Sequence, residues 1–361
     1  MKTKVIAASI ATIATVGAIT TASACSSVSA TTDYGTLVAR SLDWDTAVEA
    51  QAKIIPAGYD MESNTPSYKN AAKWTTQYKT MSLYDNPIFA GTAYDAVNDQ
   101  GLSVHGQYQE ASKPFLELHK NHDQGAPAVN NGQLATYIAS NYKTVAEAIT
   151  GLENGEWQPA FSDPLMKMDH LVPSHFNIRD AQGNVALIQL NAGGQLKVWR
   201  GSANDELRFV TNEPLFQDHL EFSKNIERDP AGRNLPADYS PLSRYVRGLH
   251  HAENQSYEGM TYQQTMAAQL QAFHSAVAIP QSIMAPSVDG PKITDEAGVF
   301  PTFFTTQYNL NNGDFVYSDL YEGQQVKFNF TEIEVGSKPV CANLTELAKN
   351  AVTTPTFGQC S

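Results

Sequence analysis

The stretch Ala22-Ser23-Ala24-Cys25-Ser26-Ser27-Val28, followed shortly by Leu37-Val38-Ala39-Arg40-Ser41-Leu42-Asp43-Trp44, decides how this chain folds. The small residues directly before Cys25 are typical of the cleavage site of a secretory leader. From Val28 the sequence becomes strand-like, and Asp33-Tyr34-Gly35 predicts a turn before the second apolar segment. Cleavage after the small residues would therefore make Cys25 the first residue of a chain that enters its core almost at once.

The leader has the three parts of a signal peptide. Lys2 and Lys4 supply a positive start, Val5–Thr21 is a stretch of apolar and small residues, and Ala22-Ser23-Ala24 fits the A-x-A pattern. We therefore predict a signal peptide at residues 1–24, one domain at residues 25–361, and export to the periplasm or the medium. The apolar stretch is short and alanine-rich for a membrane span, so we expect no stable span after processing.

A free terminal cysteine would carry its own base. The α-amine released at Cys25 has a pKa near ~8, so it accepts a proton at neutral pH far better than a lysine does. A rival interpretation is that Cys25 is the site of lipoprotein acylation, with Ala22 in the place usually taken by leucine. That interpretation predicts a polar tether after the cysteine, and the strand-like segment from Val28 leaves little room for one.

Composition excludes several functions. The formal net charge of −13 and the lack of a basic run argue against binding to nucleic acid or to anionic lipid. The nine histidines show no metal-binding spacing, and the sequence contains no Walker loop, no G-x-G-x-x-G and no G-x-S-x-G. Cys25 is thus the strongest nucleophile candidate. In an oxidising compartment Cys341 and Cys360 would be the natural disulfide pair, although all three cysteines could also be unpaired.

The remaining pattern is of many short strands and fewer helices. Hairpin signals at 180–184, 191–194 and 311–313 join several of the strands. Expected strands are Ile88–Thr92, Leu102–Tyr108, His175–Arg179, Val185–Leu190, Leu196–Arg200, Phe303–Leu310, Asp314–Asp319 and Val326–Thr331. Expected helices are Gly132–Tyr142, Val145–Leu152, Leu242–Ala252 and Tyr262–Ala276. The chain is therefore predicted to be α+β with mainly antiparallel sheets.

Five separated motifs give the chain a specific resemblance. They are Cys25, Ala39-Arg40-Ser41-Leu42-Asp43-Trp44, Asn98-Asp99-Gln100-Gly101-Leu102, Val210-Thr211-Asn212-Glu213-Pro214-Leu215-Phe216 and Leu242-Ser243-Arg244-Tyr245-Val246-Arg247, in that order. In this order they resemble the choloylglycine hydrolase family of N-terminal-nucleophile (Ntn) hydrolases, which includes penicillin V acylases and conjugated bile salt hydrolases. The resemblance implies an αββα sandwich, with two antiparallel sheets between helical layers.

The resemblance also implies roles for individual residues. Cys25 matches the thiol nucleophile, which attacks a linear amide to form an acyl-thioester. Arg40 matches a cation beside the sulfur, where it favours thiolate. Asp43 matches the carboxylate that holds the terminal ammonium. Read alone, Asp43-Trp44 could equally be a strand end with an aromatic core anchor.

The same resemblance assigns the stabilisation of the oxyanion. Asn212 matches the side-chain donor, Tyr108 falls where a backbone N–H supplies a second donor, and Arg244 completes the polar cluster. Read alone, Asn212-Glu213-Pro214 could be only a turn, and Arg244 with Arg247 could be a solvated helix face.

Substrate and assembly are less specified. Trp44, Trp74 and Tyr108 are candidates to line an acyl pocket, although Trp74 could equally be a core residue. Ala72–Tyr78 and the leader are similar to the Gram-negative penicillin acylase-like branch, which suggests phenoxyacetyl penicillins, N-acyl homoserine lactones or bile salts as the small-molecule acyl amide. The missing metal and nucleotide motifs predict no cofactor and no metal, and the resemblance allows a homotetramer. A lipid-anchored binding protein or a non-catalytic family member is the alternative.

Overall fold

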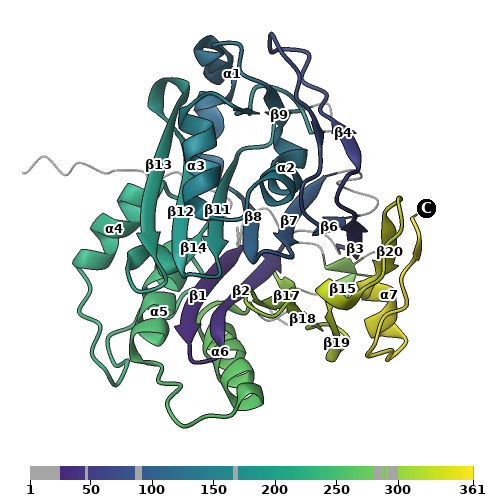
Figure 1. Cartoon of the computed structure of the whole chain (residues 1–361). Helices are drawn as coiled ribbons and strands as arrows, with labels where there is room; N and C mark the ends of the chain where they lie inside the picture. The colour runs from purple at the N-terminus through teal and green to yellow at the C-terminus, as the bar shows by residue number, and fades with distance from the viewer. Residues whose placement is uncertain are drawn as a thin grey trace, which may run out of the picture.

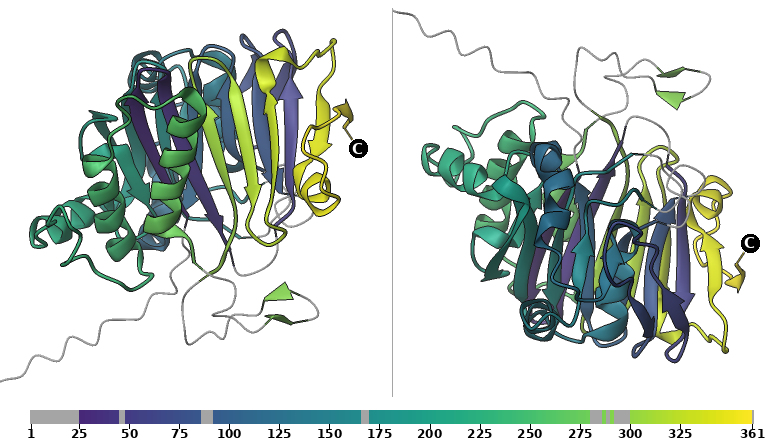
Figure 2. Two further views of the ribbon diagram at one scale, coloured as in Figure 1. Left: turned by 90° about the horizontal axis from the view of Figure 1, so that it is seen from below. Right: turned by 90° about the horizontal axis from the view of Figure 1, so that it is seen from above.

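The computed structural model describes residues 25–44, 48–85, 92–165, 170–279, 286–287, 290–291 and 300–360. The predicted leader at 1–24, and residues 88–91 of the expected strand Ile88–Thr92, lie outside these ranges. Two large antiparallel sheets stack face to face, and helices cover their outer faces (Figures 1 and 2). The predicted αββα architecture is confirmed.

The six-stranded sheet has the order β14-β1-β2-β17-β18-β19. Its strands are β14 (Phe209–Thr211), β1 (Ser26–Thr32), β2 (Gly35–Asp43), β17 (Thr302–Asn309), β18 (Asp314–Asp319) and β19 (Gln324–Asn329). The two N-terminal strands therefore lie in the interior of this sheet. Figure 2 shows α5 (Pro241–Asn254) and α6 (Tyr262–Val277) on its outer face.

The nine-stranded sheet has the order β13-β12-β11-β8-β7-β6-β3-β20-β21. Its strands are β13 (Gln195–Ser202), β12 (Asn184–Asn191), β11 (Ser174–Asp180), β8 (Leu102–Tyr108), β7 (Ala93–Asn98), β6 (Thr80–Asp85), β3 (Ala50–Ile55), β20 (Val340–Asn343) and β21 (Gly358–Gln359). Its outer face packs against α2 (Leu134–Asn141) and α3 (Val145–Glu153).

The shorter elements lie around these layers. The helices are α1 (Leu116–His119), α4 (Phe216–Lys224) and α7 (Leu344–Lys349), and the two-stranded pairs are β4 (Asp60–Glu62) with β5 (Lys73–Thr75), β9 (Ala128–Asn130) with β10 (Gln158–Ala160), and β15 (Pro286–Ser287) with β16 (Gly290–Pro291). Among the helices described, none combines the length and the apolar character needed to cross a bilayer.

Alternation along β2 directs its side chains to two different layers. Val38 and Leu42 pack between the sheets, while Ala39 packs with the core under α5 and α6. Successive residues of a strand point to opposite faces, so Arg40 points toward the nine-stranded sheet and Asp43 toward α5. Both faces of β2 are covered, and every residue from 36 to 43 is buried.

The register of β1 on β2 places Cys25 beside Arg40. Ser26 pairs with Ser41, and Ser27 pairs with Arg40. Directly opposed residues share a face, so Ser27 and Arg40 both point toward the nine-stranded sheet. By the alternation, Cys25 points the same way and Ser26 points toward α5.

Most elements follow the sequence prediction. Strand β8 has the predicted bounds, β11, β12, β13 and β17 differ from theirs by one or two residues, and the three predicted hairpin turns join the expected strands. Strand β19 ends at Asn329 rather than at Thr331, because the Asn329 side chain accepts a hydrogen bond from the Thr331 N–H and starts a 3-10 turn. Cys341 and Cys360 form a disulfide, as predicted, with an S–S distance of 2.12 Å.

Candidate active site

Cys25 directly precedes β1 and lines a cavity between the two sheets. Its residue is 4 % exposed, and its Sγ lies 3.9 Å from the backbone oxygen of Asp43. The Cys25 carbonyl oxygen accepts a hydrogen bond from the Thr211 hydroxyl (3.1 Å), which ties it to β14. The sulfur is therefore held by strands on both sides of β1.

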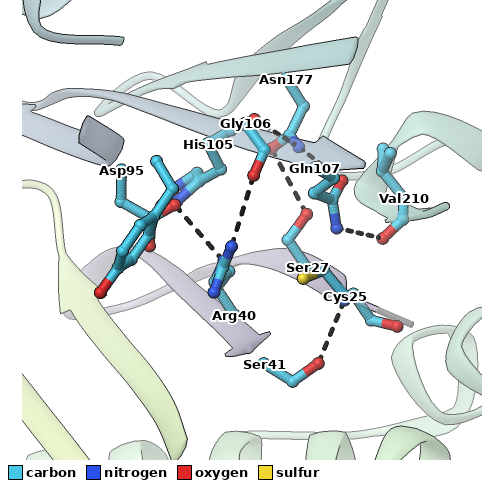
Figure 3. Close-up of polar contacts among 12 residues, drawn as sticks. Cys25, Ser27, Arg40, Ser41, Asp95, His105, Gly106, Gln107, Asn177 and Val210 are labelled. Carbon is cyan, nitrogen blue, oxygen red and sulfur yellow. Dashed lines mark hydrogen bonds and ion pairs between the residues drawn. The ribbon is translucent and has the colours of Figure 1, made fainter. Parts of the chain in front are cut away.

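Arg40 supplies a buried cation next to this sulfur. Its Nη2 donates to the Gly106 carbonyl oxygen of the facing sheet (3.3 Å), and its Nε lies 3.4 Å from Asp95 Oδ1. Figure 3 shows the guanidinium between Asp95 and Cys25. Burial is the largest single effect on the Arg40 pKa and lowers it, but Asp95 together with Cys25, Tyr94 and Tyr308 outweighs burial, so the Arg40 pKa is raised. The cation is therefore permanent.

Asp43 and Arg244 form a second ion pair on the helix side of β2. Arg244 lies in the first turn of α5, which Ser240 caps by accepting from the Ser243 N–H. Its Nη1 donates to Asp43 Oδ2 (3.1 Å) and to the Ser26 hydroxyl (3.0 Å). Burial raises the pKa of Asp43 to about 6, although the Arg244 cation opposes this shift. Asp43 Oδ1 has no hydrogen-bond partner within the described part of the chain.

Asn212 and Tyr108 bring two N–H donors to one place. Asn212 Nδ2 donates to the Tyr108 carbonyl oxygen at 2.5 Å. The Gln109 N–H donates to Pro173 on the β11 side. In an antiparallel ladder the backbone N–H and C=O groups of successive residues point to opposite neighbouring strands. The Tyr108 N–H therefore points away from β11, on the same side as the Tyr108 carbonyl. An amide nitrogen carries two protons, so Asn212 keeps one for a ligand.

The cavity beside Cys25 has an apolar wall. Its empty volume is about 610 Å³. It is lined by Cys25, Arg40, Leu42, Trp44, Val48, Thr92, Ala93, Tyr94, Gly106, Gln107, Tyr108, Asn131, Leu165, Val172, Ser174 and Phe176. Trp44 and Tyr108 meet edge to face, with ring centroids 5.9 Å apart. These two aromatic residues were predicted as pocket residues, and they do line the cavity.

Trp74 was also predicted as a pocket residue, and here the structure differs. Its indole N–H donates to the Ser140 hydroxyl (3.2 Å), and its ring packs edge to face on Tyr137 of α2. It belongs to the core between α2 and the nine-stranded sheet. In this place the Trp74 ring is packed and its indole N–H has an acceptor, as a buried tryptophan requires. Trp74 is therefore a core residue.

Burial and the Arg40 cation shift the pKa of the Cys25 thiol in opposite directions. Arg40 does lower the Cys25 pKa, but burial is the larger effect, and the thiol pKa is raised in the full chain. In that chain the Cys25 nitrogen is part of the peptide bond to Ala24. Arg40 alone therefore does not produce a thiolate, and a base is needed.

Sequence reasoning missed two carboxyl groups at this site. Asp95 lies on β7, just ahead of the Asn98–Leu102 motif, and pairs with Arg40. Glu213 follows Asn212, and burial raises its pKa to about 8 although Arg244 opposes the shift. Neither oxygen of Glu213 has a hydrogen-bond partner among the described residues. The only signal in the sequence was their position next to motif residues.

The described ranges contain no group of three or more His, Cys, Asp or Glu side chains suited to a metal ion. The residues around Cys25 supply a thiol, two ion pairs, N–H donors and an apolar wall. This set suits attack on a carbonyl carbon whose acyl group is apolar.

Comparison with known proteins identifies the family. The structure is similar to penicillin V acylase from Agrobacterium tumefaciens, with a TM-score of 0.69 and 17% identity over 88% of this chain and 91% of that one. It is also similar to a mutant of conjugated bile acid hydrolase from Clostridium perfringens, with a TM-score of 0.66 and 16% identity over 87% of this chain and 95% of that one. No curated protein sequence matches significantly. The family model for linear amide C–N hydrolases of the choloylglycine hydrolase family matches residues 25–335, so the chain belongs to this family.

Proposed function

We propose that the chain is exported, loses residues 1–24, and then uses Cys25 as an N-terminal nucleophile that hydrolyses linear acyl amides. One observation carries the proposal: in a chain of this family, Cys25 and Arg40 line an apolar cavity together with Tyr108, whose carbonyl oxygen accepts a hydrogen bond from the Asn212 amide. The family match also begins at residue 25.

Removal of the leader would supply the missing base. A free α-amine at Cys25 has a pKa near ~8 and can accept the thiol proton, directly or through water. The resulting ammonium needs a buried acceptor, and Asp43 Oδ1 is an acceptor without a partner among the described residues. Arg244 holds the other oxygen of Asp43 and fixes the carboxylate in place.

The thiolate then attacks the carbonyl carbon, and a C–S bond forms. The developing oxyanion lies between the second N–H of Asn212 and the Tyr108 N–H. The C–N bond breaks when the α-ammonium of Cys25 returns its proton to the leaving amine. Water attacks the thioester with the α-amine as base, which releases the acid and restores the thiol.

The apolar cavity supports an apolar acyl group, while the amine part remains on the side of the solvent. Phenoxyacetyl penicillins, N-acyl homoserine lactones and conjugated bile salts all have such an acyl group. Penicillin V acylase and bile acid hydrolase are among the similar structures. We place the enzyme in the periplasm or the medium, and a homotetramer is the assembly that we expect.

The alternative function is that of a lipoprotein anchored through the Cys25 sulfur. That sulfur belongs to a residue that is 4 % exposed, and β1 begins at the next residue, Ser26. A diacylglyceryl group on a sulfur between two sheets has no tether to reach a bilayer. The burial of Cys25 therefore favours the free cysteine.

The test compares three forms of the purified exported protein. Intact mass should show a chain that begins at an unmodified Cys25, and this form should release amine from at least one of the three substrates. Cys25→Ala should lose activity more than about 100-fold. A form with one glycine ahead of Cys25 keeps the thiol but converts the amine to an amide, and it should lose activity as well.

Two results would contradict the proposal. A diacylglyceryl mass on Cys25 would establish the lipoprotein instead. Full activity of the glycine-extended form would show that the α-amine is not the base.

A further inference from the structure

The direction of the Arg40 guanidinium depends on few contacts. Arg40 is 1 % exposed and lines the cavity beside Cys25. Its Nη2 donates to the neutral Gly106 carbonyl (3.3 Å), and the guanidinium carbon lies 5.0 Å from the centroid of the Tyr94 ring. The carboxylate contact that the structure gives it is with Asp95, at 3.4 Å from Nε. Figure 3 shows this carboxylate on the side of the guanidinium opposite to Cys25.

Asp95 is in turn in contact with a histidine. It lies on β7, is fully buried, and its Oδ1 is 3.1 Å from His105 Nδ1 on β8. Burial lowers the pKa of His105, so the ring is neutral near pH 7. The proton is then assigned to Nδ1, which faces the carboxylate. Arg179 and Tyr308 also face Asp95 and interact with it electrostatically.

A buried arginine has several rotatable bonds, and a charged partner is what selects one rotamer. We propose that Asp95 is a positioning residue of the Cys25 site: its carboxylate, held by His105, points the Arg40 guanidinium at the nucleophilic sulfur. The proposal rests on the function proposed above, because it concerns the same nucleophile.

The two possible effects of Asp95 on the sulfur have opposite signs. The negative charge of Asp95 by itself raises the pKa of the Cys25 thiol, whereas the Arg40 cation lowers it. If Asp95 acts on the sulfur only through its negative charge, removing the carboxylate would therefore lower the pKa of the Cys25 thiol. If Asp95 acts by orienting Arg40, removing the carboxylate would let the guanidinium turn away from the sulfur and would raise the pKa of the Cys25 thiol.

The experiment uses the mature protein that begins at Cys25. The rate of alkylation of Cys25 by iodoacetamide is measured against pH by intact mass, together with kcat and KM. For Asp95→Asn we expect a higher apparent thiol pKa and a kcat that is about 10- to 100-fold lower, with KM changed less than about threefold. Asp99→Asn, in the exposed turn that follows β7, removes the same charge outside the site and is the matched control.

An apparent thiol pKa that is unchanged or lower in Asp95→Asn, with kcat within about twofold of the wild type, would overturn the proposal. Alkylation needs no amide substrate. A wild-type protein without amidase activity would thus overturn the proposed function, while the alkylation profile would still decide the role of Asp95.

A second pair of variants covers the case in which Asp95→Asn does not fold. His105→Gln keeps an N–H donor for Asp95, whereas His105→Leu keeps the volume and removes the donor. Neither changes the charge of Asp95 or Arg40. We expect His105→Leu to raise the apparent thiol pKa and lower kcat, and His105→Gln to restore both. Equal behaviour of the two variants would overturn the proposal.

Discussion

The buried carboxyl of Glu213 makes stability depend on pH in a way that can be calculated. Its pKa is raised from 4.5 to about 8 in the folded chain, because burial disfavours the ionised form more than Arg244 favours it. Below pH 4.5 both the folded and the unfolded chain hold the proton, and Glu213 contributes nothing. As the pH rises toward 8, the unfolded chain loses this proton while the folded chain keeps it, so the free energy of unfolding falls.

The size of the effect follows from the two pKa values. Each tenfold change in a dissociation constant corresponds to about 1.4 kcal/mol, so the interval from 4.5 to about 8 corresponds to roughly 5 kcal/mol at most. A domain of this kind is stable by about 5–15 kcal/mol, so the loss is large. Glu213→Gln has no such proton. Its stability relative to the wild type should therefore increase from pH 5 to pH 8.5 by up to that amount.

The assay is urea unfolding of the mature protein, followed by tryptophan fluorescence at four pH values between 5 and 8.5. The difference between Glu213→Gln and the wild type cancels the titration of all other groups that the substitution leaves unchanged. Exposed Glu322 gives a matched control, and Glu322→Gln should change stability by less than about 0.5 kcal/mol at each pH. A difference for Glu213→Gln that stays constant across the range would refute the reasoning that burial keeps this carboxyl protonated.

Four further variants separate effects on catalysis, substrate binding and stability. Asn212→Ala removes an oxyanion donor and should lower kcat about 100- to 1000-fold with KM nearly constant, which steady-state kinetics would show. A rise in KM with little change in kcat would show instead that Asn212 contributes to ground-state binding. Replacing both Cys341 and Cys360 by serine opens a loop with a sequence separation of 19 and should cost about 3 kcal/mol in urea unfolding. Its kcat should stay within about twofold, since the disulfide lies at the β20–β21 edge of the nine-stranded sheet, whereas the nucleophile precedes β1 of the six-stranded sheet. Trp44→Ala should raise KM for an aromatic acyl amide about tenfold. Trp74→Ala should lower the free energy of unfolding by about 3–5 kcal/mol and leave KM unchanged. A raised KM for Trp74→Ala with an unchanged KM for Trp44→Ala would show that the cavity assignment is wrong.

The parts of the fold that were predicted have local signals. Strand β8 and the strands around Asn311-Asn312-Gly313 combine alternating apolar residues with turn residues of fixed backbone preference. The helix over Tyr262–Val277 begins with a capping box at Thr261 and Gln264. Each of these signals acts within a few residues, so the sequence is sufficient to place the element.

Strands β3, β6 and β7 were missed for a physical reason. Strand β7 contains Asp95 at its centre, and a buried carboxylate is not a strand signal. It is tolerated because Arg40, from the facing sheet, neutralises it. This contact joins residues 55 positions apart, so no local pattern contains it.

Part of the site could be predicted from the sequence. Four of the five motifs contain Cys25, Arg40, Asp43, Asn212 and Arg244, and the structure places these residues around the Cys25 end of β1 and β2. The sign of the net effect on the thiol depends on how deeply the sulfur is buried, which is a property of the packed sheets. The same holds for the protonated carboxyl of Glu213.

The place of Cys25 at the very start of β1 limits how this protein can be handled. Any purification tag or fusion partner left ahead of it would emerge between the two sheets, beside the wall of the cavity. The other terminus lies beyond β21, at the outermost edge of the nine-stranded sheet (Figure 1). Affinity handles, reporters and surface attachments therefore belong after Cys360, where a linker leads straight into the solvent.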